Sequence, residues 1–261
     1  MAGSVADAVF VPDGDAFVPT ENAAGPWDPN ALHGGAPAAL MARALEAVDP
    51  GIDMFVSRLT VEFMRPVPMA PLHLKTAVIR PGRRVQLLQA SLESGGQEVA
   101  RATALRIRQL EVDLPATGAA FVPPPPESGA SLSDVPWRGF GKAMEPRLVS
   151  GSVLEPGPAT VWFHLRLPIL AAEDPSPLMR AVAAADFGNG ISSEVDWLSH
   201  VFINPDLTVY LHRSPVGEWI ALESATTLQR NGVGLAQSRL YDRNGNVGTS
   251  LQAVLLERRP T

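Results

Sequence analysis

The sequence contains no cysteine, which excludes disulfides, thiolate zinc sites and a cysteine nucleophile. It has no apolar run near the roughly 18 residues that a membrane-spanning helix needs. Residues 1–10 lack the basic and apolar segments of a signal peptide, so a cytoplasmic location is expected. Basic residues are in deficit, with 21 Lys and Arg against 27 Asp and Glu and a net charge of −6. General nucleic-acid binding needs a basic face and is therefore not expected.

Several common catalytic motifs are missing as well. There is no G-x-S-x-G nucleophile elbow and no Walker A loop. Gly188-Asn-Gly190 lacks the third glycine of a dinucleotide fingerprint. The five histidines show no H-E-x-x-H or other metal-ligand spacing. We therefore expect neither a metal ion nor a bound cofactor.

The composition is that of an ordinary globular protein, with 46% hydrophobic and 18% charged residues. Its 261 residues suit one large domain or two small ones. Apolar residues at helical spacing follow His33-Gly-Gly-Ala-Pro37, and Asp49-Pro-Gly51 ends this predicted helix. Alternation with period two then predicts strands at 55–65, 72–80, 84–93 and 98–109.

Residues 113–136 break this pattern with four consecutive prolines and many Gly, Ser and Ala residues. Their composition predicts an extended linker that is long enough to cross one face of a domain. The linker separates an N-terminal unit at 1–112 from a C-terminal unit at 137–261. In the second unit we expect a helix at 177–187 and strands at 159–167, 206–213, 217–228, 234–242 and 247–258.

The two units repeat one layout. Arg65 and Arg213 occupy corresponding positions 148 residues apart, and the same offset relates Leu92 to Leu240. Each unit contains a helix and an antiparallel sheet, and the sheet must curve around the helix to cover its apolar face. Joining the two sheets edge to edge would hide two exposed strand edges. The predicted fold is therefore α+β, with two tandem units of a helix wrapped by an antiparallel sheet.

The best local signal in the first unit is His33-Gly-Gly35. Paired glycines let the backbone approach a ligand closely, and a helix N-terminus offers free N–H groups. Gly34 and Gly35 are therefore candidates to bind a carbonyl oxygen as it gains negative charge. The same motif also fits a plain glycine turn that opens a helix.

Three polar residues of the second unit are candidates for positioning a water molecule. Asp206 begins a strand, where Asp is disfavoured, although Asn204-Pro-Asp206 also fits a turn. Gln252 lies among apolar residues, so its amide needs partners that are either structural or catalytic. Thr227 alone is an ordinary strand residue. The offset of 148 places these three over Arg58, Ala104 and Ile79, so the first unit has no equivalent polar set.

At these positions the sequence resembles the acyl-CoA thioesterase II family, whose members are double hotdogs on one chain. The resemblance covers nearly the whole chain. It is carried by His33-Gly-Gly35, Phe63-Met-Arg-Pro66, Asp206 with His212-Arg213, Thr227 and Ser250-Leu-Gln252. The stretch from Ala185 to Ile191 is similar to an actinobacterial branch of this superfamily.

The resemblance implies hydrolysis of acyl-CoA without a covalent intermediate. Asp206 would accept a proton from a water molecule that Gln252 and Thr227, or the adjacent Thr226, orient toward the thioester carbon. Asp206→Asn would then abolish hydrolysis in a folded protein. The implied oxyanion donors are the amides of Gly34 and Gly35, and the implied substrate-binding residues are His33, Arg65, His212 and Arg213. Coenzyme A enters only as part of the substrate.

Two other functions stay open at this point. A non-catalytic hotdog module would bind an acyl chain or acyl-CoA without releasing thiol. A hydratase or dehydratase on the same fold would need an Asp–His pair, for which Asp28 and His33 are the nearest candidates in the sequence. For each of these functions we expect a homodimer or a higher homo-oligomer, with no nucleic-acid partner and no membrane span.

Overall fold

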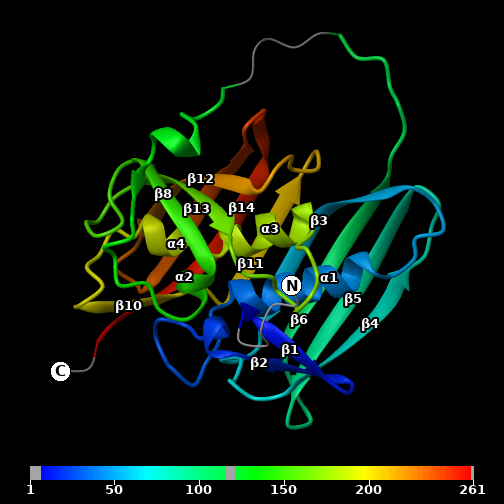
Figure 1. Cartoon of the computed structure of the whole chain (residues 1–261), viewed down its shortest axis with the longest axis horizontal. Coiled ribbons are helices and arrows are strands. Elements are labelled where there is room, and N and C mark those ends of the chain that lie inside the picture. The colour runs from blue at the N-terminus through cyan, green and yellow to red at the C-terminus, as the bar shows by residue number, and fades with distance from the viewer. Residues whose placement is uncertain (1–6, 116–120, 260–261) are drawn as a thin grey trace.

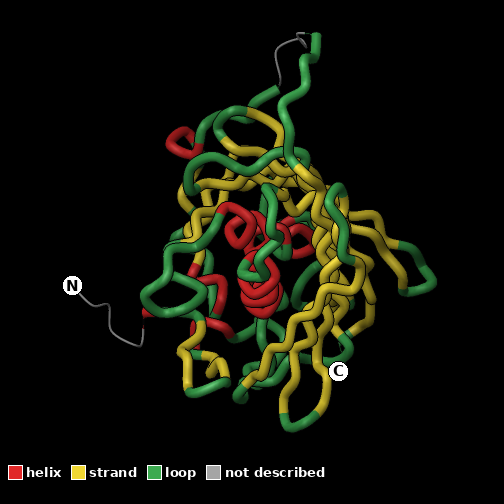
Figure 2. The backbone as a smooth tube through the Cα atoms, turned by 90° about the vertical axis from the view of Figure 1, so that its right-hand side faces the viewer, coloured by secondary structure: helices red, strands yellow, loops and turns green. Residues whose placement is uncertain are grey.

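One long curved antiparallel sheet wraps around two central helices (Figures 1 and 2). A computed structural model describes residues 7–115 and 121–259. In this part of the chain the sheet has 14 strands in the order β1-β2-β4-β5-β6-β3-β11-β14-β13-β12-β9-β8-β7, and β10 pairs with β14 beside this path. The predicted α+β class and the double hotdog arrangement are confirmed.

The N-terminal unit contributes its strands and helices as β1 (Phe10–Asp13), β2 (Ala16–Pro19), a 3-10 turn (Glu21–Ala23), α1 (Gly35–Glu46), β3 (Met54–Phe63), β4 (Leu72–Arg80), β5 (Val85–Ser94) and β6 (Gln97–Arg108). Helix α1 is rich in alanine and is buried along most of its length. Small side chains let the surrounding strands approach the helix axis closely. The sequence-based ranges for β3 to β6 differ from these bounds by at most two residues.

The 3-10 turn Pro126–Ser128 and the short strand β7 (Ala130–Ser131) lie within residues 113–136, where an extended linker is predicted, and β7 pairs with β8. The C-terminal unit contains α2 (Phe140–Ala143), β8 (Met144–Ser150), β9 (Ala159–Leu165), α3 (Pro177–Ala185), α4 (Gly188–Ile191), β10 (His200–Ile203), β11 (Asp206–Leu211), β12 (Trp219–Leu228), β13 (Val233–Asp242) and β14 (Gly245–Arg258). Helix α3 begins after Ser176, whose hydroxyl accepts the Met179 N–H at 3.0 Å. Pro177 in the first turn lacks an N–H that would have no partner there.

The two units join through the antiparallel pair β3–β11. At its centre Thr60 pairs with Thr208, and their hydroxyl oxygens are 3.2 Å apart. These two threonines are equivalent positions of the repeat, because they lie 148 residues apart in sequence. A local two-fold axis therefore passes between them, and the predicted edge-to-edge join is present.

The strand registers of the two units agree with the same offset. Leu88 pairs with Ala104 in β5–β6, and Ala236 pairs with Gln252 in β13–β14. Both members of the second pair lie 148 residues after those of the first. The repeat read from the sequence is thus a repeat of strand pairing, and Gln252 occupies the place that Ala104 has in the first unit.

Helices α1 and α3 lie side by side and run in opposite directions inside the sheet (Figure 2). At one end a Cβ added to Gly35 would stand 3.0 Å from the Ala183 carbonyl oxygen. At the other end the Ser176 hydroxyl donates to Glu46 at 2.5 Å. The beginning of α1 therefore meets the end of α3, and this meeting point brings the two units together at the helix level.

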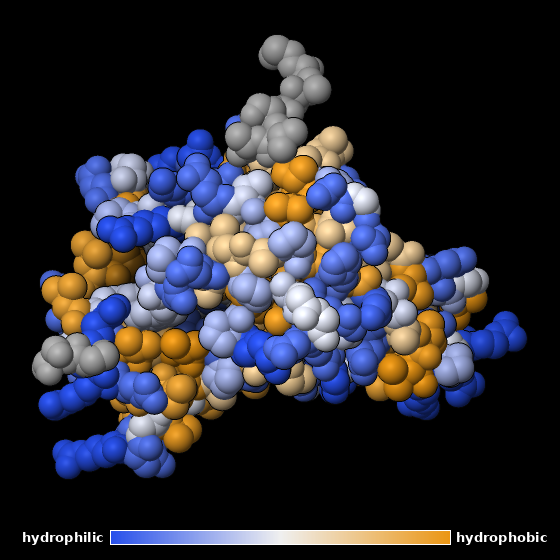
Figure 3. Space-filling view, turned by 90° about the horizontal axis from the view of Figure 1, so that it is seen from below, coloured by the Kyte–Doolittle hydropathy of each residue, from blue (hydrophilic) through white to orange (hydrophobic). Residues whose placement is uncertain are grey.

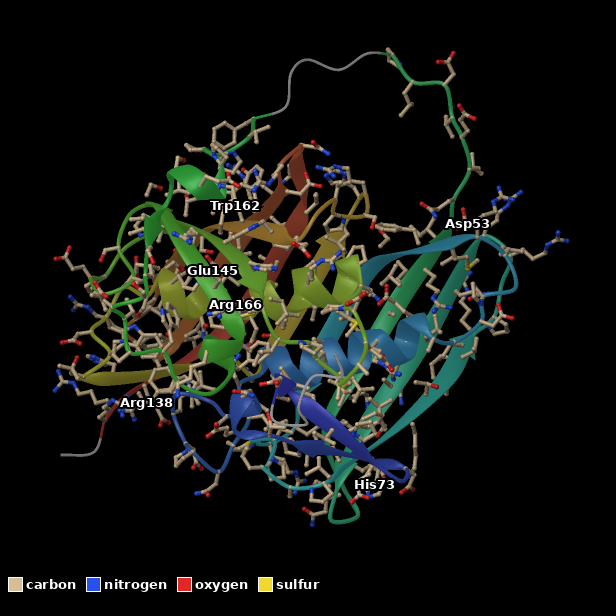
Figure 4. The ribbon with its side chains drawn as sticks, viewed as in Figure 1. Asp53, His73, Arg138, Glu145, Trp162 and Arg166 are labelled. Atoms are coloured by element: carbon tan, nitrogen blue, oxygen red, sulfur yellow. The ribbon has the colours of Figure 1, made fainter. Side chains whose placement is uncertain are left out.

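The linker leaves the N-terminal unit after β6 and reaches the C-terminal unit near β12 (Figure 1). Residues 116–120 of the predicted linker lie outside the described part. Near its middle the linker is held by Trp162, labelled in Figure 4, which donates its indole N–H to the Pro124 carbonyl at 2.7 Å. Among the described residues no helix is long and apolar enough to cross a bilayer. Figure 3 shows apolar and polar side chains in intermixed patches on the face seen from below.

Gly248 gives a test of the pairing between β11 and β14. A Cβ at this position would lie 1.9 Å from the Tyr210 carbonyl oxygen, which belongs to the backbone of the neighbouring strand. Gly248→Ala is expected to lower the free energy of unfolding by about 1–3 kcal/mol, because the strands must separate locally. Urea unfolding measures this change. Gly190→Ala is the control, since its added Cβ would meet only Trp197 ring carbons at 3.5 Å and beyond. Equal stability of both variants would contradict this strand register.

Candidate functional site

Gln252 is the buried polar residue around which the site is built. It lies on β14 with 1% of its surface exposed and points from the sheet toward the helices. Its Oε1 accepts the backbone N–H of Asn189 at 3.0 Å. Its Nε2 lies 3.3 Å from both the backbone carbonyl and the Oδ1 atom of Asp186. The amide is therefore satisfied, and one of its partners is a carboxylate.

Asp186 directly follows α3 and is itself 3% exposed. Its Oδ1 accepts the Asn204 side-chain N–H at 2.8 Å in addition to the contact with Gln252. Its Oδ2 stands 3.0 Å from Nδ1 of His33. A buried carboxylate is costly unless it is paired and hydrogen-bonded, and three different elements supply its partners here. This convergence of buried polar groups makes Asp186 a candidate functional residue.

The first unit contributes the start of α1. A Cβ added to Gly34 would lie 2.8 Å from Asp186 Oδ2 and 2.8 Å from the ring of Phe63, so glycine is required for this approach. The ring of His33 packs against Phe187 at 4.4 Å between centroids. Within the described chain the Gly34 N–H has no hydrogen-bond acceptor. It is therefore available to a ligand at the helix N-terminus.

The cluster thus consists of His33, Gly34, Asp186, Asn204 and Gln252, and we call it the inter-unit cluster. It lies where α1 begins, where α3 ends and where β14 passes beneath them. Its members come from both units. Of the two glycines, Gly34 has an N–H without an acceptor in the described chain, whereas the Gly35 N–H donates to His33 Nδ1 at 3.1 Å.

Asp206 and Thr227 lie on the opposite face of the sheet from Gln252. Asp206 alternates with the fully buried Leu207, and its Oδ1 accepts the Ala253 N–H at 2.7 Å. Thr227 is exposed. Adjacent strand residues point to opposite faces, so neither side chain can share a water molecule with Gln252 on the inner face. The structure does not bring the trio of Asp206, Thr227 and Gln252 together.

Thr226 does face inward, on the second strand from the one that carries Gln252. It pairs with Ala236, which in turn pairs with Gln252, so the three residues lie in one line across the inner face. The Thr226 hydroxyl lies 2.7 Å from that of Ser192. Between Thr226 and Thr227, only Thr226 points to the side of the sheet that holds Gln252.

His212 and Arg213 lie beyond the far end of β11, whereas Asn204 lies just before its start. His212 lines a groove of about 820 Å³ on the outer face of the C-terminal sheet, together with Tyr241 and Glu223. The Tyr241 hydroxyl donates to Glu223 at 2.6 Å, and burial together with this carboxylate raises the pKa of Tyr241 to about 12. This groove is separated from the inter-unit cluster by the sheet.

Arg213 binds Asp242 in a two-point ion pair at 2.5 and 2.6 Å. Asp242 is fully buried and also accepts the N–H groups of Val216 and Asn244, each at 2.8 Å. Burial alone would raise the pKa of this carboxyl. The hydrogen bonds from Arg213 and the two amides lower the pKa by more than burial raises it, so the pKa of Asp242 is below its ordinary value. Arg213 therefore has a structural role here, because it links the end of β11 to Asp242 at the end of β13.

Asp242→Asn should therefore destabilise the protein by on the order of 3 kcal/mol, because it leaves the Arg213 guanidinium beside a neutral partner. The folded-state pKa of Asp242 is depressed, so its contribution is present above the unfolded pKa and is lost as the pH falls through the folded value. Urea unfolding at pH 7 and pH 3 measures both effects. A difference between wild type and variant that does not shrink at pH 3 would contradict the pairing.

The equivalent place at the other end of the helix pair is closed by charged side chains. Arg106, 3% exposed, donates to the carbonyls of Leu45, Glu46 and Val48 at the end of α1. Burial lowers the pKa of Arg106 and raises the pKa of the Glu46 carboxyl. Arg106 thus caps the C-terminal end of α1 and within the described chain leaves no second polar site there. Among the described residues, the polar cluster around Gln252 is therefore found at one end of the helix pair.

Comparisons with known proteins agree with this architecture. The profile of the acyl-CoA thioesterase N-terminal domain matches residues 23–107, and that of the acyl-CoA thioesterase C-terminal domain matches residues 117–256. The chain belongs to the acyl-CoA thioesterase family. No curated protein matches this thioesterase-family chain.

Solved structures show the same fold. A candidate thioesterase II of Thermobifida fusca superimposes with a TM-score of 0.76 at 20% identity, covering 97% of this chain and 96% of that one. A conserved hot dog protein of unknown function from Alicyclobacillus acidocaldarius gives 0.74 at 18% identity, with 98% of each chain covered. The acyl-CoA thioesterase II of Mycobacterium marinum gives 0.63 at 16% identity, with 87% and 91% covered.

Sequence reasoning found Gln252, His33 and the two glycines but missed Asp186 and Asn204. Asp186 interrupts an otherwise apolar and small-residue run that extends from α3 into α4. A lone carboxylate in a segment predicted to be a buried helix is a signal that could have identified it. For Asn204 the sequence predicts only a turn, in Asn204-Pro-Asp206.

Proposed function

We propose that this thioesterase-family chain hydrolyses acyl-CoA thioesters at the inter-unit cluster. The observation that carries the proposal is the buried Gln252 amide held against the Asp186 carboxylate beside the N-terminus of α1. The cluster combines a fixed negative charge, amide groups that can orient water and a free backbone N–H. These are the components that water attack on a carbonyl carbon requires.

In this proposal the thioester carbonyl oxygen lies at the start of α1 and accepts the Gly34 N–H. A preorganised donor of this kind is typically worth about 2.7–4 kcal/mol in the transition state. Water lies between the carbonyl carbon and the polar atoms of Gln252 and Asp186. The C–S bond breaks as the C–O bond forms, and no side chain becomes acylated.

The phosphates of coenzyme A need a cation near the cluster. Arg65 is an exposed residue two positions after Phe63, whose ring contacts the place where Gly34 would carry a Cβ. Its guanidinium donates to the neutral Gln97 side chain, which leaves its charge available. Arg65 is therefore the proposed phosphate contact, and His212 and Arg213 are too far along the sheet to serve the same ligand end.

The rival function is a hotdog module that binds acyl-CoA without cleaving it. It would use the same site geometry but would not need a buried carboxylate held beside water-orienting amides. Thiol detection separates the two functions directly. Homo-oligomer formation stays a prediction for both.

The experiment is a panel of short, medium, long and branched acyl-CoAs, with release of free coenzyme A followed by a thiol reagent and binding followed by calorimetry. Hydrolysis of at least one chain-length class with a stoichiometric thiol yield is the expected result. Saturable binding across the panel without thiol release would replace hydrolysis with the binding function.

A further inference from the structure

Asn204 holds one oxygen of the Asp186 carboxylate. Its Nδ2 donates to Asp186 Oδ1 at 2.8 Å, whereas Gln252 Nε2 donates to the same oxygen at 3.3 Å. The Asn204 amide also donates to the backbone carbonyl of Asp206 at 3.0 Å. Asn204 lies between β10 and β11, so these bonds tie the carboxylate that follows α3 to the sheet.

Backbone groups decide which way both amides of the inter-unit cluster are turned. A peptide N–H only donates and a carbonyl oxygen only accepts. Asn204 must therefore turn Nδ2 toward the Asp206 carbonyl, which leaves its Oδ1 to accept from Asn189 Nδ2 at 3.4 Å. Gln252 must turn Oε1 toward the Asn189 N–H, which leaves its Nε2 toward Asp186. Neither amide can be reversed without losing its backbone partner.

The two amides reach the same oxygen of Asp186. Oδ1 receives both of them, and among the described residues Oδ2 receives no hydrogen bond. Oδ2 faces the start of α1, because a Cβ on Gly34 would stand 2.8 Å from it. One oxygen of the carboxylate is therefore fixed, and the other is left open beside the Gly34 N–H, which has no acceptor in the described chain.

His33 does not fill this open place. Its Nδ1 stands 3.0 Å from Asp186 Oδ2, but Nδ1 accepts the Gly35 N–H at 3.1 Å. A ring nitrogen that accepts a hydrogen bond has no hydrogen of its own to donate. Within the described chain Oδ2 is thus without a donor, and a water molecule is a group that can supply one.

We propose that Asn204 is a positioning residue of the thioesterase reaction, which holds Asp186 in the rotation that leaves Oδ2 open to the attacking water. This inference rests on the proposed function. Oδ2 takes a proton from water as the water oxygen bonds to the thioester carbon. When the C–S bond breaks, the proton passes from Oδ2 to the coenzyme A sulfur, which leaves a carboxylic acid and a free thiol.

Asp186 needs an external hold because its own torsion does not fix the carboxylate. The χ2 torsion of aspartate joins an sp³ to an sp² atom and has broad minima. The Gln252 contact at 3.3 Å is longer than the usual range of about 2.7–3.2 Å, whereas the Asn204 contact at 2.8 Å lies within it. Loss of the Asn204 amide should therefore let the carboxylate turn, so that Oδ2 leaves the start of α1.

The first test is Asn204→Ala with Asn246→Ala as the matched control. Both asparagines are partly buried, and each makes three side-chain hydrogen bonds. Those of Asn246 join it to the Leu240 and Gly248 carbonyls and to His212, beside the groove that the sheet separates from the inter-unit cluster. The two variants lose equal numbers of hydrogen bonds, and urea unfolding shows whether their folds are equally affected.

Steady-state kinetics then separate a positioning role from a structural one. Asn204→Ala should lower kcat by on the order of 10²-fold, as a small misplacement of a reacting group does. KM should stay unchanged, because the lost interaction acts in the transition state and not on bound substrate. Asn246→Ala should change neither constant. Equal losses of kcat in the two variants would overturn the positioning role and leave hydrolysis itself standing.

Asn204→Asp gives a readout that a purely structural role would not move. It places an oxygen 2.8 Å from Asp186 Oδ1, and two carboxylates this close share one proton. The shared proton replaces the hydrogen of the amide, and its loss sets two charges against each other. The ratio of variant to wild-type kcat should therefore rise as the pH falls from about 8 to about 5. His33 and Asp206 titrate in both proteins and cancel in this ratio, and Asn246→Asp should give a flat one. A flat ratio for Asn204→Asp would contradict the inference.

A crystal structure of Asn204→Ala tests the inference without any turnover. The Asp186 carboxylate is expected to have rotated, with Oδ2 no longer facing Gly34. A carboxylate in the wild-type rotation would overturn the inference. Because this readout is independent of activity, a wild-type protein that hydrolyses no acyl-CoA would count against the proposed function alone.

Discussion

Asp186→Asn is expected to reduce kcat for acyl-CoA hydrolysis by about 10²–10⁴-fold, the scale that a positioned acid–base side chain contributes. The substitution is isosteric, and the new side chain keeps an oxygen that can accept the hydrogens of Asn204 and Gln252. It loses the negative charge and presents either a donor or a neutral acceptor to His33. Steady-state kinetics with a thiol reagent measure the effect, and circular dichroism checks the fold.

Asp206→Asn is the decisive comparison, because the family resemblance alone assigned the catalytic carboxylate to Asp206. This side chain lies on the outer face and accepts the Ala253 N–H, a contact that an asparagine oxygen can keep. Its kcat should stay within about threefold of the wild type, since no contact with the inter-unit cluster is lost. If Asp206→Asn were inactive and Asp186→Asn active, the cluster would not be the catalytic site.

Gln252→Leu should lower kcat by about 10²–10³-fold, the range found when one preorganised amide donor is removed from a catalytic site. Leucine has a similar size, but it cannot donate to Asp186 or accept the Asn189 N–H. The unpaired backbone N–H would also cost about 1–3 kcal/mol of stability. Kinetics and urea unfolding of the same preparation separate these two effects.

Gln237→Leu provides the control for Gln252→Leu. Gln237 is an exposed glutamine on β13, on the outer face of the same sheet. It should change neither kcat nor the free energy of unfolding by more than a surface substitution usually does, about 0.5 kcal/mol. Comparable losses in both variants would mean that the effect belongs to the sheet and not to the cluster.

The long elements of this fold could be read from the sequence because local pattern and tertiary packing agree in them. Strands β3 to β6 and β11 to β14 alternate with period two, and the offset of 148 residues predicts that the second set repeats the first. The register and the join at Thr60 and Thr208 are seen only in the structure. The short elements β1, β2, β10, α2 and α4 lack such a pattern. Four or fewer residues carry too little periodicity to identify an element.

The separation of Asp206 from Gln252 could not be predicted for a related reason. The sequence shows that Asp206 and Gln252 are both unusual on strands, but not that they face opposite sides of one sheet. That fact depends on the antiparallel register, in which Asp206 lies opposite Ala253 and not Gln252. The true neighbour of Gln252 approaches from the end of α3, 66 residues away in sequence. Similarly, the contact between His33 and Asp186 exists only because α1 and α3 run antiparallel across the join.

The most direct test of the central claim is a crystal structure with a nonhydrolysable acyl-CoA analogue, in which a methylene group replaces the thioester sulfur. The account predicts that the carbonyl oxygen lies within hydrogen-bond distance of the Gly34 or Gly35 N–H, on the inner face of the sheet. The carbonyl carbon should lie beside His33 and Gln252. An analogue whose carbonyl lies on the outer face, next to Asp206 and Thr227, would contradict the account.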